Sequence, residues 1–250
     1  MKINDIIKRL EKEFPKELAY EWDNVGLLVG DRDREVTNVV VCLDVTEDVV
    51  DFAKSADAEL IISHHPLLFA PINRINGDTK NGKLLMDIIE NKIAVYSAHT
   101  NCDKAECGIN ARLAEMFDLD DIEPLEEDGL GRIGSLKAGV SLTDFAKTVE
   151  EKLGVKVRFC GDTKTMVKKV AICSGSGADL VDTAIKKGAD VLLTGDTKYH
   201  QMLDSKDSIN IVDAGHFGTE NIVTEIFAEI LCDMGVSVFW KDTEDVFKYL

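Results

Sequence analysis

Four of the five histidines in this chain follow short apolar runs that are typical of buried strands. His64 and His65 end one such run, predicted as a strand over 59–62. Adjacent side chains of a regular strand point to opposite faces, so two neighbouring histidines converge only where the chain leaves the sheet. Pro66 restricts His65 to an extended conformation at such an exit. The pair can serve two metal ions or two corners of one, although one packed and one solvated imidazole would give the same pattern.

The other two histidines of this set each precede a carboxylate by four residues. His99 is followed by Asp103, and His216 by Glu220. Where a strand gives way to a helix, this spacing places both side chains on one face. Imidazole nitrogen with carboxylate oxygen suits zinc, iron, manganese, cobalt or nickel. A structural helix cap explains each motif alone, but the whole set exceeds what one ion requires and favours two divalent ions in a dinuclear centre.

Two further segments are weaker candidates for substrate binding. Ser174, Gly175 and Gly177 join a predicted strand to a helix, where backbone amides can bind an anion. A tight turn explains them equally well, and Leu180 stands where a dinucleotide fingerprint requires its third glycine. Trp22 lies among polar residues, where it either stacks on a ring or covers the core.

An internal repeat organises the positions of these residues. The run VVVCLDVTEDVVDFAKSADAELIISHH from Val39 aligns without a gap on VAICSGSGADLVDTAIKKGADVLLTGD from Val170, an offset of 131. Each copy reads as strand, helix and parallel strand. A shifted offset of 117 then places His99 on His216. Chance similarity between two generic units is the alternative to duplication, but matched positions over so long a run favour duplication.

Polar residues also follow the apolar run at 191–193. Thr194-Gly195-Asp196 occupies the place that Ser63-His64-His65 has in the first half, so the histidine pair is absent there. Asp196 and His200 are candidates for substrate contact or acid–base catalysis. The chain has no phosphate-loop motif, no Gly-x-Ser-x-Gly elbow and no His-Glu-x-x-His.

The repeat predicts an α/β fold made of two similar domains. The acidic stretch at 118–128 contains few core residues, so we place the first domain at 1–125 and the second at 126–250. Ligands of open α/β sheets bind beyond the carboxyl ends of the strands. We therefore expect the strand ends of both domains to face one shared cleft that holds the metal centre.

Composition is that of a soluble globular chain. Apolar residues make up 45% of the 250 residues, which excludes a disordered protein. The formal net charge of −17 repels phosphate backbones and disfavours a broad nucleic-acid-binding face. It does not exclude a local basic pocket. The N-terminal residues do not resemble a signal peptide, and no apolar run is long enough to span a bilayer. We expect a cytoplasmic protein that makes no membrane contact and keeps its six cysteines reduced.

Six sequence blocks, in order, resemble the GTP cyclohydrolase 1 type 2 homologues, also called the NGG-one-interacting-factor-three-like proteins. The blocks are WDNVGLLVG from Trp22, ISHHPLLF from Ile62, SAHTNCD from Ser97, GLGRIG from Gly129, TGDTKYH from Thr194 and DAGHFGTE from Asp213. The resemblance implies a dinuclear metal centre in the interdomain cleft and a ring-shaped homohexamer. It also implies the metal ligands His64, His65, Asp103, His216 and Glu220, with His99 beside the ions to orient a water or shuttle a proton.

The activity that this resemblance implies is hydrolytic opening of the guanine ring of GTP, with water attacking C8 and formate leaving. In this hypothesis His99 or His200 moves protons, while Trp22 and the loop at 174–177 hold the nucleotide. A metal-dependent phosphohydrolase or nuclease is the alternative enzyme, since two adjacent metals also suit displacement at phosphorus. A non-catalytic ring-shaped binding or scaffold protein, which could contact DNA, is the alternative outside enzymes.

Overall fold

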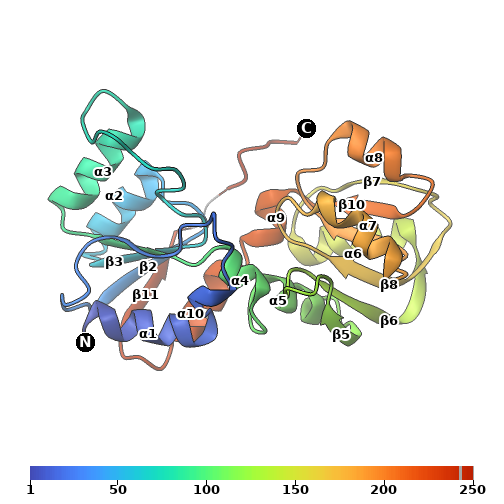
Figure 1. The fold of residues 1–250 in the computed structure, drawn as a ribbon, viewed down its shortest axis with the longest axis horizontal. Coiled ribbons are helices and arrows are strands. Elements are labelled where there is room, and N and C mark those ends of the chain that lie inside the picture. The colour runs from blue at the N-terminus through green and yellow to red at the C-terminus, as the bar shows by residue number, and fades with distance from the viewer. Residues whose placement is uncertain (242–243, 250) are drawn as a thin grey trace. The chain divides into compact units, whose positions relative to one another are not determined.

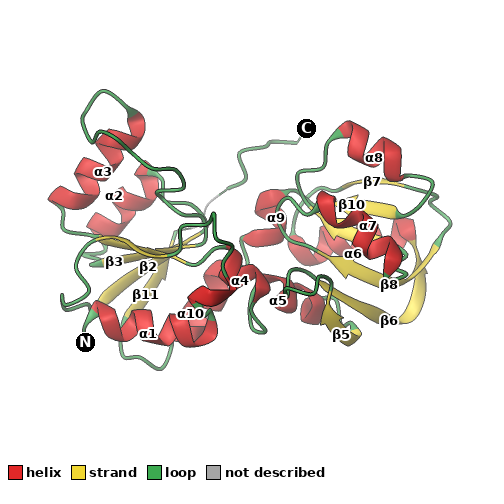
Figure 2. Ribbon diagram, in the orientation of Figure 1, coloured by secondary structure: helices red, strands yellow, loops and turns green. Residues whose placement is uncertain are grey.

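The chain forms two compact α/β units. The computed structural model describes residues 1–241 and 244–249. Unit 1 comprises Met1–Ala105 and Ile222–Thr243, and unit 2 comprises Glu106–Asn221 and Glu244–Leu250. Each unit is a sheet covered by helices (Figures 1 and 2), so the predicted α/β class is confirmed. None of the helices within the described residues is long and apolar enough to cross a membrane.

Unit 1 is built on a five-stranded sheet. Its elements are α1 (Ile3–Glu13), η1 (Lys16–Leu18), β1 (Gly26–Val29), β2 (Asn38–Cys42), α2 (Glu47–Ser55), β3 (Leu60–Ser63), α3 (Lys80–Glu90), β4 (Ala94–Ser97), α4 (Thr100–Lys104), α10 (Val223–Leu231) and β11 (Ser237–Trp240). The strand order is β1-β4-β3-β2-β11, and only β1 runs antiparallel to its neighbour. The parallel strands are apolar nearly throughout because helices cover both faces of the sheet.

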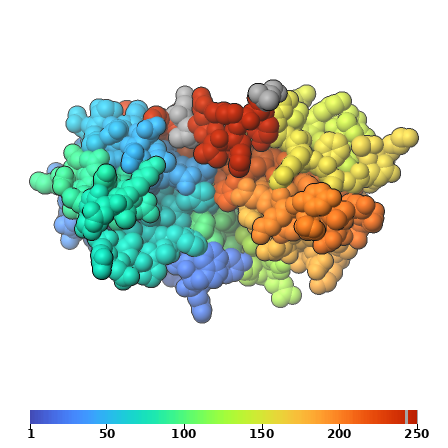
Figure 3. Space-filling model, turned by 90° about the horizontal axis from the view of Figure 1, so that it is seen from above, coloured from blue at the N-terminus to red at the C-terminus, as the bar shows by residue number. Residues whose placement is uncertain are grey.

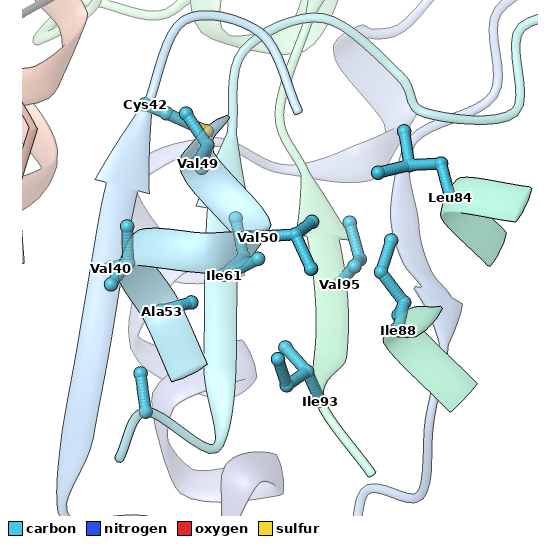
Figure 4. Close-up of a cluster of buried hydrophobic side chains, with 11 residues drawn as sticks. Val40, Cys42, Val49, Val50, Ala53, Ile61, Leu84, Ile88, Ile93 and Val95 are labelled. Carbon is cyan, nitrogen blue, oxygen red and sulfur yellow. The ribbon is translucent and has the colours of Figure 1, made fainter. Parts of the chain in front are cut away.

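Helices α2 and α3 cover one face of this sheet (Figure 4). Val40, Ile61 and Val95 point from β2, β3 and β4 into the cluster. Helix α2 begins where the Thr46 hydroxyl accepts a hydrogen bond from the Val49 amide, which caps the helix and fixes its apolar side toward the sheet. From the helices, the buried side chains are those of Val49, Val50, Ala53, Leu84 and Ile88. This packing holds the carboxyl ends of β3 and β4 in place.

Unit 2 is built on a six-stranded sheet. Its elements are α5 (Ile109–Met116), β5 (Asp120–Pro124), β6 (Arg132–Ser141), α6 (Leu142–Leu153), β7 (Arg158–Cys160), β8 (Met166–Ile172), η2 (Ala178–Leu180), α7 (Val181–Lys186), β9 (Val191–Thr194), α8 (Tyr199–Ser205), β10 (Asn210–Asp213) and α9 (His216–Glu220). The strand order is β5-β6-β8-β9-β10-β7, with β8, β9 and β10 parallel. Ala171, Leu192 and Ile211 from these strands pack against Ala184 of α7.

The two sheets share one strand topology. The order β4-β3-β2 of unit 1 matches β10-β9-β8 of unit 2, and the antiparallel β1 and β7 pair with β4 and β10. In the parallel ladders Val39 faces Leu60 and Val170 faces Val191, so both members of the pair are 131 residues apart. The predicted duplication and its first offset are therefore confirmed.

The predicted equivalence after the third strand is wrong by one residue. Helices α4 and α9 have equal lengths and begin at Thr100 and His216, so the backbone offset is 116 and not 117. His216 is thus the counterpart of Thr100, and Glu220 that of Lys104, whereas His99 is the cap residue before its helix. The offset of 117 aligns the two histidine–carboxylate motifs with each other. The pairing of β4 with β3 and of β10 with β9 instead gives a backbone offset of 116.

The compact units differ from the predicted domains at 1–125 and 126–250. Helix α5, from the first repeat, packs on β6 and β8 of unit 2. Helix α10, from the second repeat, packs on β2, β11 and α1 of unit 1, where Phe227 meets Phe14 edge-on with ring centroids 6.0 Å apart. The chain therefore changes unit directly after α4 and directly after α9, and each repeat supplies its last helix to the core of the other unit.

Candidate metal centre

Three histidines converge in unit 1 at the carboxyl ends of two parallel strands. His64 and His65 follow β3, and His99 follows its neighbour β4. Ligand nitrogens from the three rings all lie within 4.8 Å of one another. Their ring centroids are 5.1 to 5.7 Å apart. This spacing fits imidazoles around one divalent ion or two adjacent ones.

Each of these rings is oriented through its Nδ1 atom. His64 Nδ1 lies 2.9 Å from the carbonyl oxygen of Ala98, and His65 Nδ1 lies 2.9 Å from Asp44 Oδ1. His99 Nδ1 lies 2.9 Å from Asp23 Oδ1. A carbonyl or carboxylate oxygen only accepts, so Nδ1 carries the proton and the Nε2 of a neutral ring keeps its lone pair. Metal-binding histidines are held in this way, with the outer nitrogen fixed and the inner one left for the ion.

Helix α4 adds a carboxylate to the cluster. Asp103 Oδ1 is 3.6 Å from His64 Nε2, and the His64 side chain is fully buried. Asn101 fixes the start of the helix, since its side chain accepts from the His99 amide and donates to the carbonyl of Phe14, both at 2.9 Å. An anionic oxygen facing imidazole nitrogens completes a donor set that suits a divalent transition metal.

Asp23 is held ionised at the edge of this cluster. Burial raises the pKa of its carboxyl group, but hydrogen bonds from the His99 ring and from the hydroxyl and amide of Thr100 outweigh that effect and lower the pKa to about 2. Asp23 therefore stays negatively charged at neutral pH. Its carboxylate accepts the hydrogen bond from His99 Nδ1 and so fixes the tautomer of that ring.

Aromatic side chains border His99 on its exposed side. Trp22, which is 59% exposed, stacks on Tyr20 with ring centroids 5.4 Å apart and meets His99 edge-on at 6.4 Å. Phe69 meets both Trp22 and His99 edge-on. The ammonium group of Lys104 lies 3.3 Å from the centre of the Tyr20 ring. Trp22 therefore does not cover the core. Its contact with a substrate ring stays a prediction, and Phe69 is placed to make the same contact.

Unit 2 holds the second predicted ligand pair on α9. His216 Nε2 lies 2.8 Å from Glu220 Oε2, and the Glu220 side chain is only 5% exposed. His216 Nδ1 lies 2.8 Å from Asp196 Oδ2, so this ring is oriented like the three in unit 1. Ligands that lie about 2.1 Å from one ion are roughly 3 Å apart, so the pair fits neighbouring positions around a divalent ion.

The loop at 174–177 uses its backbone amides within unit 2. The amides of Ser174, Gly175 and Gly177 donate to Asn110 Oδ1, Thr219 Oγ1 and Thr194 Oγ1, at 2.8, 2.9 and 2.9 Å. These bonds hold the loop against α9 and β9, as expected if the segment is a structural turn. Contact of the loop with substrate stays a prediction.

Gly175 makes room for the ligand pair on α9. Its φ of +61° is left-handed, and a Cβ atom there would lie 2.1 Å from Glu220 Oε1 and 3.2 Å from His216 Nε2. Only glycine adopts this backbone conformation without strain and also leaves the carboxylate in place. From the sequence, this glycine is expected in an anion-binding loop or in a tight turn.

Two further predicted residues, Asp196 and His200, lie outside the clusters of potential metal ligands. Asp196 Oδ2 lies beside the His216 ring, and its predicted role in substrate contact or acid–base catalysis stays a prediction. His200 is exposed on α8, where its ring packs edge-on against Tyr199, and it belongs to none of the potential ligand groups among the described residues. Sequence reasoning missed Asp44 and Asp23. Asp44 could have been found as a carboxylate that closely follows a predicted strand. Asp23 could have been found as a carboxylate inside the block that begins at Trp22.

Comparisons with known proteins agree with the fold and with the sequence blocks. Residues 1–245 match the family described as Duf34/NIF3 (NGG1p interacting factor 3). A Clostridium perfringens protein named GTP cyclohydrolase 1 type 2 homolog is 42% identical over 88% of this chain and 87% of its own length. Two solved structures are also similar. A Bacillus cereus protein related to NIF3 has a TM-score of 0.92 at 28% identity, covering 100% of this chain and 99% of that chain. Reduced HcgD from Methanocaldococcus jannaschii has a TM-score of 0.88 at 32% identity, covering 97% and 98%.

Proposed function

Because this chain belongs to the Duf34/NIF3 family, we propose that it is a metal-dependent hydrolase that acts on a nucleotide, with GTP as the first substrate to test. The observation that carries the proposal is the common orientation of four histidines. In His64, His65, His99 and His216 an acceptor oxygen fixes Nδ1 and so sets the orientation of the ring. Side chains that serve only packing do not require four such anchors.

In this proposal the ligands of two divalent ions are His64, His65, Asp103, His216 and Glu220. When bound, such ions lower the pKa of a water molecule and so supply a nucleophile at neutral pH. That the ligands of both units hold the same ions is part of the proposal, and it follows from the sequence resemblance. The identity of the metal is left to analysis of the purified protein.

His99 is the residue best suited to move the proton of the attacking water. Asp23 fixes its Nδ1 as a donor, so Nε2 accepts the proton as water adds to C8 of the guanine ring. The same nitrogen returns the proton to the ring nitrogen that leaves when the C8–N bond breaks. A second water then releases C8 as formate. Trp22 and Phe69 border this histidine and offer faces for the purine.

The test is anaerobic purification with metal analysis, followed by turnover assays with each candidate metal. Formate release from GTP that disappears after chelation supports the proposal. Release of inorganic phosphate instead would identify a phosphohydrolase. If the metal-loaded protein releases neither product from any nucleotide, the hydrolase proposal is wrong and a binding role takes its place.

We also propose the homohexameric ring that the resemblance implies. Light scattering coupled to size exclusion gives the mass of the assembly directly. Six chains of 27.6 kDa are the expected result, and a monomer at micromolar concentration would contradict it.

A further inference from the structure

Unit 2 contains a pocket that the sequence analysis did not predict. Its volume is about 520 Å³, within the range of small-molecule sites. We call it the C-terminal pocket, since residues 247–249 line one side; its lining residues are Lys156, Val157, Arg158, Asp196, Asp213, Gly215, Phe247, Lys248 and Tyr249. The segment at 244–249 is dark red at the surface in Figure 3. All nine residues belong to unit 2.

The pocket is lined by three basic and two acidic side chains. The chain carries −17 overall, yet three of the lining side chains are basic. Of the two carboxylates, Asp213 is buried and engaged by Arg158, by the backbone and hydroxyl of Thr197 and by the Gly215 amide. These contacts lower the pKa of Asp213 against the effect of burial, so it is a fixed anchor for the guanidinium group.

The other two basic groups extend from the exposed rim. Lys156 has 66% and Lys248 has 68% of its side chain exposed, each beside one glutamate. Exposed ion pairs of this kind contribute little and exchange readily for a stronger partner such as a phosphate. Arg158 donates from Nε and Nη2 to Asp213 and from Nη2 to the Thr197 carbonyl, which fixes its planar group in the pocket wall.

Two aromatic rings stand beside these charges. Phe247 is 65% exposed and Tyr249 is 60% exposed, although both line the pocket. Exposed aromatic faces next to cationic groups are the combination that binds a heterocyclic base carrying phosphates. An apolar ligand would not use the three cations, and an inorganic anion would not use the rings.

The pocket is lined by two residues that neighbour His216 of α9. Asp196 lines it and also holds His216 Nδ1 at 2.8 Å, while Gly215 lines it and precedes His216 in the chain. A ligand in the pocket therefore lies next to the residue that orients a candidate metal ligand. That adjacency distinguishes the pocket from a remote surface hollow.

We propose that the C-terminal pocket is a nucleotide-binding subsite, in which an aromatic base stacks on Phe247 or Tyr249 and the basic side chains hold the phosphates. The inference rests on the proposed function only where it treats the bound nucleotide as the substrate. None of the proposed metal ligands lines the pocket, so we expect binding to persist in protein stripped of metal.

The experiment is titration calorimetry of the full chain in EDTA, with GTP, guanosine and inorganic triphosphate as separate probes. We expect GTP to bind at least about tenfold more tightly than either fragment, because only GTP uses both the rings and the cations. Phe247→Leu and Lys248→Ala should each weaken GTP binding by about tenfold. Both residues are exposed, so neither change should alter folding.

Lys147→Ala is the matched control, because Lys147 is a lysine of unit 2 that is 67% exposed, is paired with an acidic side chain and lies outside the pocket. It should bind GTP like the parent chain. The inference is overturned if the stripped chain does not bind GTP, or if the pocket variants bind it as tightly as the control. Tight binding that depends on the pocket, together with a failure to release formate or phosphate under any metal, would retain the subsite and reject the hydrolase.

Discussion

Asp196 Oδ2 lies 2.8 Å from His216 Nδ1, on the side of the ring that faces away from Glu220. Through this contact Asp196 orients the His216 ring, while its predicted role in substrate contact or acid–base catalysis stays a prediction. The carboxylate accepts from Nδ1 and so fixes the tautomer of the ring. Asp196 has a left-handed backbone, with φ of +52°, so its position is set by a strained turn rather than by a regular strand end.

Asp196→Ala should therefore weaken metal binding. We expect the affinity for the ion to fall by about ten- to a hundredfold, the usual effect of losing such an outer partner. Competition with a chromophoric chelator measures it. Asp204→Ala, on exposed α8, should leave the affinity unchanged. Unchanged affinity in the Asp196 variant would show that His216 does not need its anchor to bind metal.

Glu220→Gln should lower the metal content while the fold persists. Glutamine keeps the shape of the side chain but removes the charge that balances a divalent ion. We expect the bound metal to fall well below two ions per chain, as it should for His65→Ala. Elemental analysis gives the stoichiometry, and circular dichroism checks folding. Glu225→Gln, exposed at the start of α10, is the control. Two ions retained per chain in the Glu220 variant would contradict the predicted ligand set.

Gly175→Ala should affect both stability and metal binding. The left-handed conformation costs an alanine about 1 kcal/mol, and the new methyl group also displaces the Glu220 carboxylate. Gly188→Ala separates the two effects, since Gly188 has a similar φ of +75° with no atom within 4 Å of the added Cβ. Chemical denaturation should show a loss in both variants, while only the Gly175 variant should bind metal more weakly. Equal metal affinity in the two would rule out the steric role of Gly175.

The sequence predicted well what depends on local pattern. The β-branched runs and the offset of 131 gave the parallel strands and their pairing, because an ungapped duplication preserves the register between two strands. The predicted strands also place His64, His65 and His99 close together, because neighbouring parallel strands end at one edge of the sheet. The offset of the following segment was one residue off because side-chain chemistry, rather than the backbone, had guided the alignment.

What the sequence did not predict depends on contacts between distant segments. Asp23 meets His99 across 76 residues and Asp44 meets His65 across 21, and no spacing rule within one helix or strand gives such pairs. The exchange of α5 and α10 between units was equally hidden, because an amphipathic helix packs on either of two similar sheets with the same apolar pattern.

The stability of the chain should depend on pH through Asp23, a dependence best measured in metal-free protein. Because its pKa in the folded state is about 2, below the ordinary value of 3.8, the ionised carboxylate stabilises the fold above about pH 4. That contribution is lost as the pH falls from about 4 to about 2. The shift corresponds to about 1 to 2 kcal/mol once solvent screening is included. Urea denaturation of Asp23→Asn between pH 2 and 5 should lack this part of the slope, whereas Asp207→Asn, at an exposed turn, should retain it. Equal slopes in the two variants would show that the contacts of Asp23 with His99 and Thr100 do not stabilise its charged form.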